Sequence, residues 1–228
     1  MKLKYLGHSA FYIDSANVKM LIDPFITGNP TSGEHVDHYY NIDYIFVTHG
    51  HGDHLGDTVS IGKKSGATVV TNFEIANYLS QFQLNCHGMH IGGRHKFDFG
   101  TVKMTPALHG SGIQTDHGMI YGGNPAGFVI EVDGVKIYHA GDTGLTMDMQ
   151  LLARENIDNA LLPIGGNFTM DSEDAQIAVE FIKPKMVVPM HYNTFEIITV
   201  NPEDFVAGLP ENVSGRIMKS GETIEISL

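Results

Sequence analysis

Short segments in which hydrophobic and polar residues alternate fill the first quarter of the chain and predict β-strands. They are rich in β-branched or aromatic residues, they are separated by Asn, Asp, Ser or Gly, and they read KLKYLG (2–7), AFYID (10–14), VKMLID (18–23) and DYIFVTH (43–49). Farther on, ATVVTN (67–72) predicts a strand and FEIANYLSQF (73–82) a helix. This alternation of strands and helices indicates a fold of the α/β class.

Two hairpins are predicted farther along the chain. GFVIEVDGVKIYHAG (127–141) has the two-residue turn Asp133-Gly134, and RHKFDFGTVKMTPALH (94–109) turns at Gly100. Helices are predicted near 55–59, 145–152 and 175–182, and Pro184 stops the last of them. The segments MVVPMH (186–191), GRIMKS (215–220) and ETIEIS (222–227) are expected to close the chain as strands.

The two hairpin regions resemble each other and predict an internal repeat. FYIDSANVKML (11–21) matches FVIEVDGVKIY (128–138), Asn41-Ile42-Asp43 recurs as Asn156-Ile157-Asp158, and Val69-Val70 recurs as Val187-Val188. Each half therefore reads as hairpin, strand, helix, strand. We expect two similar halves that face each other; the alternative is that hairpins share turn chemistry and the matches are coincidence.

Composition limits the number of domains and the compartment. With 228 residues, 42% hydrophobic and 18% charged, the chain is long enough for one substantial core, so we expect one globular domain over 1–228. No segment approaches the roughly 18 apolar residues of a membrane span, and MKLKYLGHSA lacks the apolar core of a signal peptide. The only cysteine, Cys86, cannot form an internal disulfide, which favours the cytoplasm.

Charge argues against nucleic acid and draws attention to histidine. The net charge is −12, the opposite of the basic surface that binds nucleic acid, so no nucleic-acid partner is expected. A cationic site in such a protein would have to come from metal ions. The 13 histidines, against 14 Lys and Arg together, make a metal site worth examining.

The segment THGHGDHLGD (48–57) concentrates imidazoles and carboxylates between glycines. If the preceding strand continues as extended chain, His49 and His51 project to the same side and can hold one metal together. The glycines between them let the backbone turn, so that Asp53 and His54 reach a second ion beside the first. The spacing predicts a binuclear site; the alternative is a polar surface loop.

With four further segments, this cluster resembles the metallo-β-lactamase superfamily of metal-dependent hydrolases. The landmarks, in order, are Asp23 in LIDP, the H-x-H-x-D-H cluster, His109 in PALHG, Asp142 in AGDTG and His191 in VPMHY. GHS (7–9), AGDTG, PIGGNFTM (163–170) and PMHYNTF (189–195) look like the hydrolase group related to L-ascorbate-6-phosphate lactonases and to N-acylphosphatidylethanolamine phospholipase D. The resemblance covers nearly the whole chain and implies a four-layer αββα sandwich of two similar halves.

The same resemblance implies roles for the landmark residues. One metal would be bound by His49, His51 and His109, the second by Asp53, His54 and His191, and Asp142 would bridge them; Asp53 and Asp142 are the expected catalytic residues. Imidazole and carboxylate ligands suit two divalent ions, Zn²⁺ in the first place, with Mn²⁺ or Fe²⁺ as alternatives. Asp23 resembles an aspartate that orients a ligand histidine and binds no metal itself.

The remaining histidines are sorted by their segments. His117 is the rival of His109, but it lies in a glycine-rich segment without a predicted strand, so we favour His109. His8 follows the first strand and either lines the pocket, where it would contact substrate, or packs in the core. The others are expected to be ordinary surface or core histidines: His35, His38, His87, His90, His95 and His139.

Several loop residues are expected around the pocket. Residues 110–126 form either a lid, whose glycines permit movement, or a plain surface loop. Segments that follow strands of the second half would orient the substrate through Asn167, Thr169, Tyr192 and Asn193, or merely cap the helix that follows.

The expected activity is hydrolysis of a small-molecule or lipid substrate. A hydroxide that bridges the metals would attack a lactone or ester carbonyl, or a phosphodiester. A diiron redox enzyme of the same fold is one alternative, but those enzymes resemble H-x-E-x-D, and His51 stands where their glutamate would be. A metal-binding protein without catalysis is the other, because it would need the same ligands.

Overall fold

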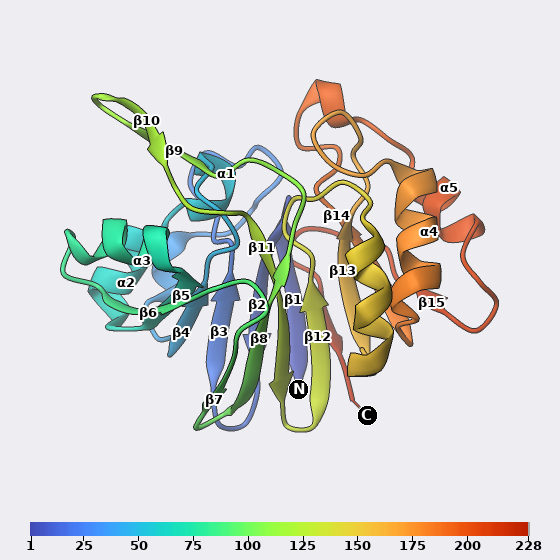
Figure 1. Cartoon of the computed structure of the whole chain (residues 1–228), viewed down its shortest axis with the longest axis horizontal. Coiled ribbons are helices and arrows are strands. Elements are labelled where there is room, and N and C mark those ends of the chain that lie inside the picture. Colours follow the sequence, from blue (N-terminus) through green and yellow to red (C-terminus); the bar gives the residue numbers. More distant parts are fainter. Residues whose placement is uncertain (228) are drawn as a thin grey trace.

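The computed structural model of the chain describes residues 1–227 and contains two seven-stranded β-sheets (Figure 1). The first sheet consists, in spatial order, of β16 (Thr223–Glu225), β1 (Lys2–Gly7), β2 (Ala10–Asp14), β3 (Lys19–Ile22), β4 (Tyr44–Phe46), β5 (Thr68–Asn72) and β6 (Asn85–Met89). The second consists of β15 (Ser214–Gly215), β14 (Met186–Met190), β13 (Asn159–Pro163), β12 (Val135–His139), β11 (Ala126–Val132), β8 (Gly100–Pro106) and β7 (Arg94–Phe97).

Helices cover the outer face of each sheet. The first sheet is covered by η1 (Val36–Tyr39), α2 (Thr58–Ser65) and α3 (Phe73–Ser80), and the second by η2 (Met147–Glu155), α4 (Ser172–Ile182) and α5 (Pro202–Ala207). Local sequence fixes their limits: the Asp171 side chain caps α4 by accepting from the Asp174 N–H, and α4 ends before Pro184.

Three hydrophobic clusters hold the layers together. The central cluster lies between the sheets, where the rings of Phe46 and Phe128 are 5.4 Å apart. A second cluster, with Ile45 and Ile75, lies between the first sheet and its helices, and a third, with Val179, lies between the second sheet and its helices. The expected αββα sandwich is therefore confirmed.

The strand registers of the two halves confirm the internal repeat. In the hairpins, Phe11 pairs with Ile22 as Phe128 pairs with His139. In the next strand pairing, Met20 pairs with Tyr44 as Ile137 pairs with Asn159. In the one after it, Tyr44 pairs with Thr68 as Asn159 pairs with Met186. Side chains repeat as well, because the carboxylates of Asp43 and Asp158 accept from the N–H groups of Lys19 and Lys136, both at 2.8 Å. The two halves are thus similar in register and in local bonding.

The loops that follow β4, β8, β12 and β14 meet at one edge of the sandwich, here called the site edge. Two short helices, α1 (Gly52–Leu55) and η3 (Glu196–Ile198), lie in these loops. A hairpin of β9 (Gly112–Thr115) and β10 (Gly118–Tyr121) projects from the same edge (Figure 1). Chemistry-bearing side chains commonly lie at such strand ends in α/β folds.

Four local features differ from the expectations. The segment 110–126 contains a hairpin, although its glycines gave no strand pattern, and β6, which contains His87, lies where the sequence indicated no strand. The helix expected at 145–152 is the 3₁₀ helix η2. GRIMKS and ETIEIS contribute only β15 and β16, which pair in different sheets, because the chain crosses between the sheets there. Among the described residues, no helix is long and apolar enough to cross a bilayer.

Candidate metal centre

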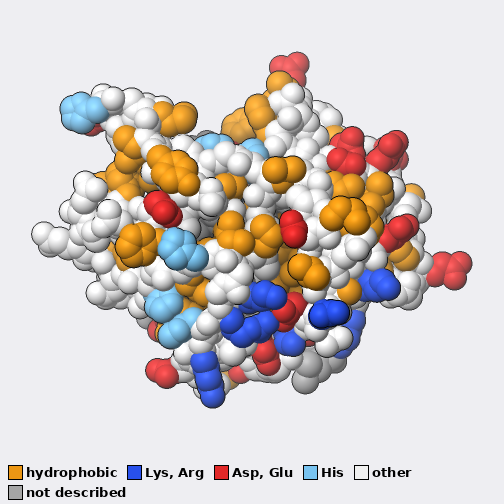
Figure 2. Space-filling view, in the orientation of Figure 1, with side chains coloured by type: hydrophobic (Ala, Val, Ile, Leu, Met, Phe, Trp, Pro, Cys, Tyr) orange, Lys and Arg blue, Asp and Glu red, His pale blue; other side chains and the backbone are white. Residues whose placement is uncertain are grey.

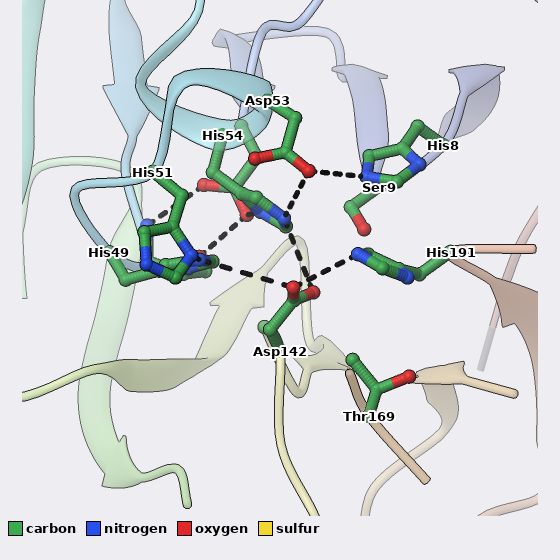
Figure 3. A network of polar contacts seen from close by, with 12 residues as sticks. His8, Ser9, His49, His51, Asp53, His54, Asp142, Thr169 and His191 are labelled. Carbon is green, nitrogen blue, oxygen red and sulfur yellow. Dashed lines mark hydrogen bonds and ion pairs between the residues drawn. The ribbon is translucent and has the colours of Figure 1, made fainter. Parts of the chain in front are cut away.

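The seven ligands expected from the sequence converge at the site edge, and Figure 3 labels all of them except His109. They come from both halves, because the H-x-H-x-D-H cluster follows β4, His109 follows β8, Asp142 follows β12 and His191 follows β14. Three overlapping groups bring their ligand atoms within 4.8 Å of one another: His49, His51 and His109; His49, His54 and Asp142; and His8, Asp53, His54 and His191.

Asp142 lies in the middle of this arrangement. Its carboxylate oxygens are 2.9 Å from Nε2 of His191, 3.2 Å from Nε2 of His54 and 3.5 Å from Nε2 of His109. Nε2 of His49 follows at 4.0 Å. One carboxylate therefore faces imidazoles of both expected metal groups, as a bridging ligand must.

Asp23 sets which nitrogen of two histidines carries the proton. It is fully buried, and its oxygens accept from the Thr48 N–H at 2.8 Å, from the Thr48 hydroxyl at 2.7 Å and from Nδ1 of His54 at 2.7 Å. Since the Thr48 hydroxyl gives its proton to Asp23, its oxygen accepts from Nδ1 of His49 at 3.0 Å. In His49 and His54 alike, Nε2 keeps its lone pair for the centre.

His8 lies behind Asp53. Its Nε2 is 3.0 Å from Oδ2 of Asp53, its Nδ1 is 2.9 Å from the Thr194 hydroxyl, and its side chain is fully buried. Its carbonyl accepts the N–H of His191 at 2.8 Å. His8 adopts φ +59 and His191 φ +55, a left-handed conformation that costs about 1–2 kcal/mol per residue. The turn between β1 and β2 thus joins Asp53 to the strand end that carries His191.

Burial and mutual charge shift the pKa values of these groups. Burial lowers the pKa of His49, His51 and His109, and neighbouring imidazoles lower it further, so these side chains are neutral and able to bind metal. Burial opposes ionisation of Asp142, but His54 and His191 outweigh it and hold the Asp142 pKa well below its usual range. Burial likewise opposes protonation of His54, yet the carboxylates of Asp142 and Asp23 raise its pKa.

Two buried atoms at the centre have no hydrogen-bond partner. They are Nε2 of His54 and Oδ1 of Asp142, which lie 3.2 Å apart without the geometry of a hydrogen bond. Buried polar atoms are rarely left unsatisfied, since the cost is about 1–3 kcal/mol each. The raised pKa of His54 favours a proton at this position in the metal-free chain, and a divalent ion held between the imidazole and the carboxylate can replace it, so the donor set suits divalent metal ions.

The expected substrate-binding residues divide into two kinds. Thr169 is partly exposed and Asn167 is exposed on one loop, which the Met170 N–H joins to the carbonyl of Thr143, the residue after Asp142, at 2.9 Å. Tyr192 instead packs in the hydrophobic cluster of the second sheet, and Oδ1 of Asn193 accepts the Val200 N–H within its own loop. The structure therefore brings Asn167 and Thr169 to the site edge and uses Tyr192 and Asn193 for packing and loop shape.

The segment 110–126 is tied to the histidine cluster. Ser111 Oγ accepts the Gly50 N–H at 3.1 Å and donates to the Gly122 carbonyl at 2.8 Å, and Ile113 packs on Gly50. His117 is exposed between β9 and β10, far from the base that Ser111 anchors. His109, whose side chain is 13% exposed, is the histidine that faces Asp142.

Three supporting residues were not singled out from the sequence. Thr48 links Asp23 to His49, and Thr194 contacts His8. His139 donates from Nε2 to the Ser9 carbonyl at 2.9 Å and accepts the Gly141 N–H on Nδ1 at 3.1 Å, so it joins the β1–β2 turn to the peptide before Asp142. Only Thr48 carried a signal, since it adjoins the cluster; the other contacts join residues distant in sequence.

Comparison with known proteins identifies the class. Residues 2–191 match the family model described as the Beta-lactamase superfamily domain, so the sandwich and its histidine cluster define a member of the metallo-β-lactamase superfamily. A protein of Alkaliphilus metalliredigens called a UPF0173 metal-dependent hydrolase is 64% identical over 205 residues, which is 90% of this chain and 91% of the relative. The chain belongs to this family of metal-dependent hydrolases.

Solved structures agree with this assignment. Igni18, described as a metallo hydrolase from the archaeon Ignicoccus hospitalis, superposes with a TM-score of 0.89 at 39% identity and covers 99% of both chains. CmlA, a diiron β-hydroxylase from Streptomyces venezuelae, superposes with a TM-score of 0.76 over 99% of this chain and 54% of its own, at 15% identity. The second likeness is one of fold alone.

Proposed function

We propose that residues 1–228 form a single hydrolase domain that holds two divalent ions and cleaves a carbonyl ester, a lactone or a phosphodiester. The observation that carries the proposal is the position of Asp142, whose carboxylate lies within 4.0 Å of imidazole nitrogens from His49, His54, His109 and His191. Zn²⁺ is the preferred ion, with Mn²⁺ and Fe²⁺ as alternatives that suit the same ligands.

The ligand sets follow the geometry. His49, His51 and His109 would hold one ion, and their Nε2 or Nδ1 atoms lie within 4.8 Å of one another. Asp53, His54 and His191 would hold the other, and Asp142 would bridge the two. His8 has the right distance to donate to Oδ2 of Asp53, the oxygen that also faces Nε2 of His54 at 4.0 Å, and thereby to orient it, so its role is positioning and not substrate contact.

Two such ions would lower the pKa of a water molecule and polarise the group under attack. The chain's own residues prepare the centre for that chemistry. Asp23 and Thr48 keep the protons of His54 and His49 on Nδ1, and the deeply depressed pKa of Asp142 keeps its carboxylate ionised between the imidazoles. Asp53, with its side chain 29% exposed, lies at the open side, where substrate would approach.

The proposed substrate is a small molecule or a lipid. The similarity of the GHS, AGDTG and PMHYNTF segments to lactonases and to a phospholipase supports a lactone or phosphodiester over a β-lactam. The net charge of −12 opposes binding of a nucleic acid polymer. The cytoplasm remains the proposed compartment, on the ground of the single cysteine.

Metal analysis and a substrate panel test the proposal together. Elemental analysis of metal-replete protein should give two ions per chain; a reproducible value of one, or none, contradicts the bridging role of Asp142. Bis(p-nitrophenyl) phosphate, sugar lactones, a β-lactam reporter and structured RNA should then be compared with Zn²⁺ and with Mn²⁺. We expect turnover of bis(p-nitrophenyl) phosphate or of the sugar lactones. A preference for RNA at roughly physiological salt would instead indicate a nuclease.

A redox enzyme is the second candidate, because the diiron hydroxylase CmlA shares the fold. The residue that opposes it is His51, whose imidazole occupies the place of a carboxylate in the diiron pattern. Oxygen consumption by the Fe²⁺-loaded protein, measured beside hydrolysis by the Zn²⁺-loaded protein, separates the two. Oxygen uptake without hydrolysis would favour the redox enzyme, and activity of neither kind would favour a metal-binding protein.

A further inference from the structure

The segments that carry the expected ligands, and the loops named with them below, contain no Lys or Arg. They are residues 7–10, 23–35, 47–57, 107–125, 140–146, 164–171 and 191–201, all within the described chain, and the 14 Lys and Arg lie outside them. The Lys and Arg side chains visible in Figure 2 gather toward the opposite end of the molecule. Enzymes that hold a second phosphate on their substrate normally use such side chains. Within these segments the metal ions would therefore supply the positive charge for a substrate. Of the neighbouring cations, Lys4 is paired with Glu34 at 2.7 Å, and Lys219 adjoins Ser220, whose Oγ approaches Gly7.

Acidic groups at the same edge strengthen this restriction. Asp57, Asp116, Asp171 and Glu196 lie in these loops in addition to the carboxylates of the centre, whereas the carboxylate of Glu34 is paired with Lys4. An anionic group of the substrate outside the centre would meet like charge without a compensating cation. A sugar phosphate, a nucleotide or an anionic bilayer surface thus fits this edge poorly.

Large hydrophobic side chains are exposed in these loops. Five of them, here called the apolar rim, are Leu108 (63% exposed), Met119 (68%), Phe168 (52%), Phe195 (41%) and Ile197 (60%). At the top of Figure 2, hydrophobic side chains lie on the projecting hairpin and on the second prominence across from it, and histidine atoms are visible between the two. Exposed apolar side chains in the loops around a candidate site are typical of surfaces that bind a partner or a ligand.

The rim is attached directly to the centre. The Leu108 carbonyl accepts the N–H of Gly144, in the turn that carries Asp142, at 3.1 Å. The ring of Phe195 is 5.6 Å from the ring of His8. Phe168 lies in the loop that the Met170 N–H joins to the Thr143 carbonyl, next to Asp142, at 2.9 Å. Apolar surface therefore begins where the metal ligands and their supports end.

From these two observations we propose that the substrate is a dispersed amphiphile: one hydrolysable ester or lactone group, no further anionic group, and an alkyl chain that lies on the apolar rim. The inference rests on the proposed function. Hydrolysis adds water across the acyl C–O bond, so the acyl carbon gains a hydroxyl, the leaving oxygen gains the proton, and a carboxylic acid and an alcohol result. Monomers are favoured over bilayer lipid because the edge lacks the cations that attract membranes.

A series of lactones of increasing chain length tests this on metal-loaded protein. γ-Butyrolactone, γ-octalactone and γ-dodecalactone should be used below their aggregation limits, beside gluconolactone and its 6-phosphate. Each methylene buried on the rim should raise kcat/KM by about two- to fourfold, the value that transfer of a methylene from water permits. The phosphorylated sugar lactone should be the poorest substrate of the panel.

Rim variants and a matched control assign the effect to named side chains. Leu108→Ser and Ile197→Ser should each lower the ratio of kcat/KM for the twelve-carbon over the four-carbon lactone by about tenfold. Ile177→Ser, which removes a similar side chain that is 40% exposed on α4, should leave that ratio unchanged. Calorimetric binding of 1-decanol to the metal-free protein should weaken in the two rim variants and not in Ile177→Ser.

The outcomes separate this inference from the proposed function. Hydrolysis of lactones without dependence on chain length would overturn the amphiphile and leave the hydrolase. Preference for the 6-phosphate, or for an ester presented only in anionic vesicles, would overturn it as well. If no substrate is hydrolysed and the rim variants bind decanol as the parent does, both the amphiphile inference and the proposed function are contradicted.

Discussion

Replacing Asp23 with asparagine tests whether one buried carboxylate fixes the protonation of the metal-facing histidines. Both carboxylate oxygens accept hydrogen bonds, one from the Thr48 N–H and the other from the Thr48 hydroxyl and from Nδ1 of His54. An asparagine keeps one acceptor oxygen and presents an NH₂ donor in place of the other. If the oxygen stays with the Thr48 N–H, the NH₂ group faces Nδ1 of His54, which must become an acceptor.

That exchange would move the proton of neutral His54 to Nε2, the atom 3.2 Å from Oδ1 of Asp142. The lone pair that would bind an ion is then lost. Removing a group that orients a metal ligand typically weakens metal binding about 10- to 100-fold. This corresponds to about 1.4 to 2.7 kcal/mol, and it should fall first on the ion that His54 would share with Asp53 and His191.

Competition with a chromogenic chelator measures the affinity of each ion. Asp57→Asn is the matched control, because Oδ2 of Asp57 accepts the N–H groups of Ile26 and Thr27 at 3.1 and 2.7 Å, and an asparagine oxygen can keep both. We expect Asp23→Asn to lose at least about tenfold in the weaker site and Asp57→Asn to match the parent. An Asp23→Asn affinity within about threefold of the parent, or an equal loss in the control, would refute the tautomer argument.

Three further predictions concern other parts of the centre. His109→Ala should lower metal occupancy and remove activity, while His117→Ala should keep the full occupancy by elemental analysis; the reverse would exchange their roles. Burial lowers the pKa of His139 below 6.5, so at acidic pH this side chain is protonated in the unfolded chain and neutral in the folded one. The free energy of unfolding of the metal-free protein should therefore fall as the pH drops below about 6.5. A free energy from urea unfolding that stays constant from about pH 7 to 5 would contradict this. Gly165→Ala should reduce thermal stability and metal affinity together, because its Cβ would overlap the His191 carbonyl; unchanged calorimetric and chelator titrations would show that the strand end can yield.

The sequence predicted the parts of the fold that depend on local pattern. Alternating residues located strands such as β2 and β11, and the matching residues Phe11 and Phe128 predicted a repeat that the strand registers confirm. The H-x-H-x-D-H spacing located the cluster because its chemistry is written in consecutive residues. These features needed no knowledge of which strands pair across the sandwich.

Features that depend on distant contacts could not be predicted in this way. The hairpin of β9 and β10 is held by Ser111, whose side chain forms hydrogen bonds with both Gly50 and Gly122. The periodicity of the sequence does not predict these contacts. His139 has the pattern of a core strand residue, yet both of its ring nitrogens form hydrogen bonds with turns beside the metal centre, through Ser9 and Gly141. Tyr192 follows a strand end, as a pocket residue would. Its side chain nevertheless packs in the hydrophobic cluster between the second sheet and its helices, and which side it faces depends on that tertiary packing.

The equal registers of the two halves have a consequence for how the chemistry is distributed. They make strand ends equivalent in pairs: β3 with β12, which precede Asp23 and Asp142, and β4 with β13, which precede the histidine cluster and a glycine loop without ligands. One half thus carries most of the imidazoles, and the other supplies the central carboxylate. The halves are alike in strand register and different in the ligands that their loops carry, so a loop grafted from one half to the other would meet strand ends of matching register.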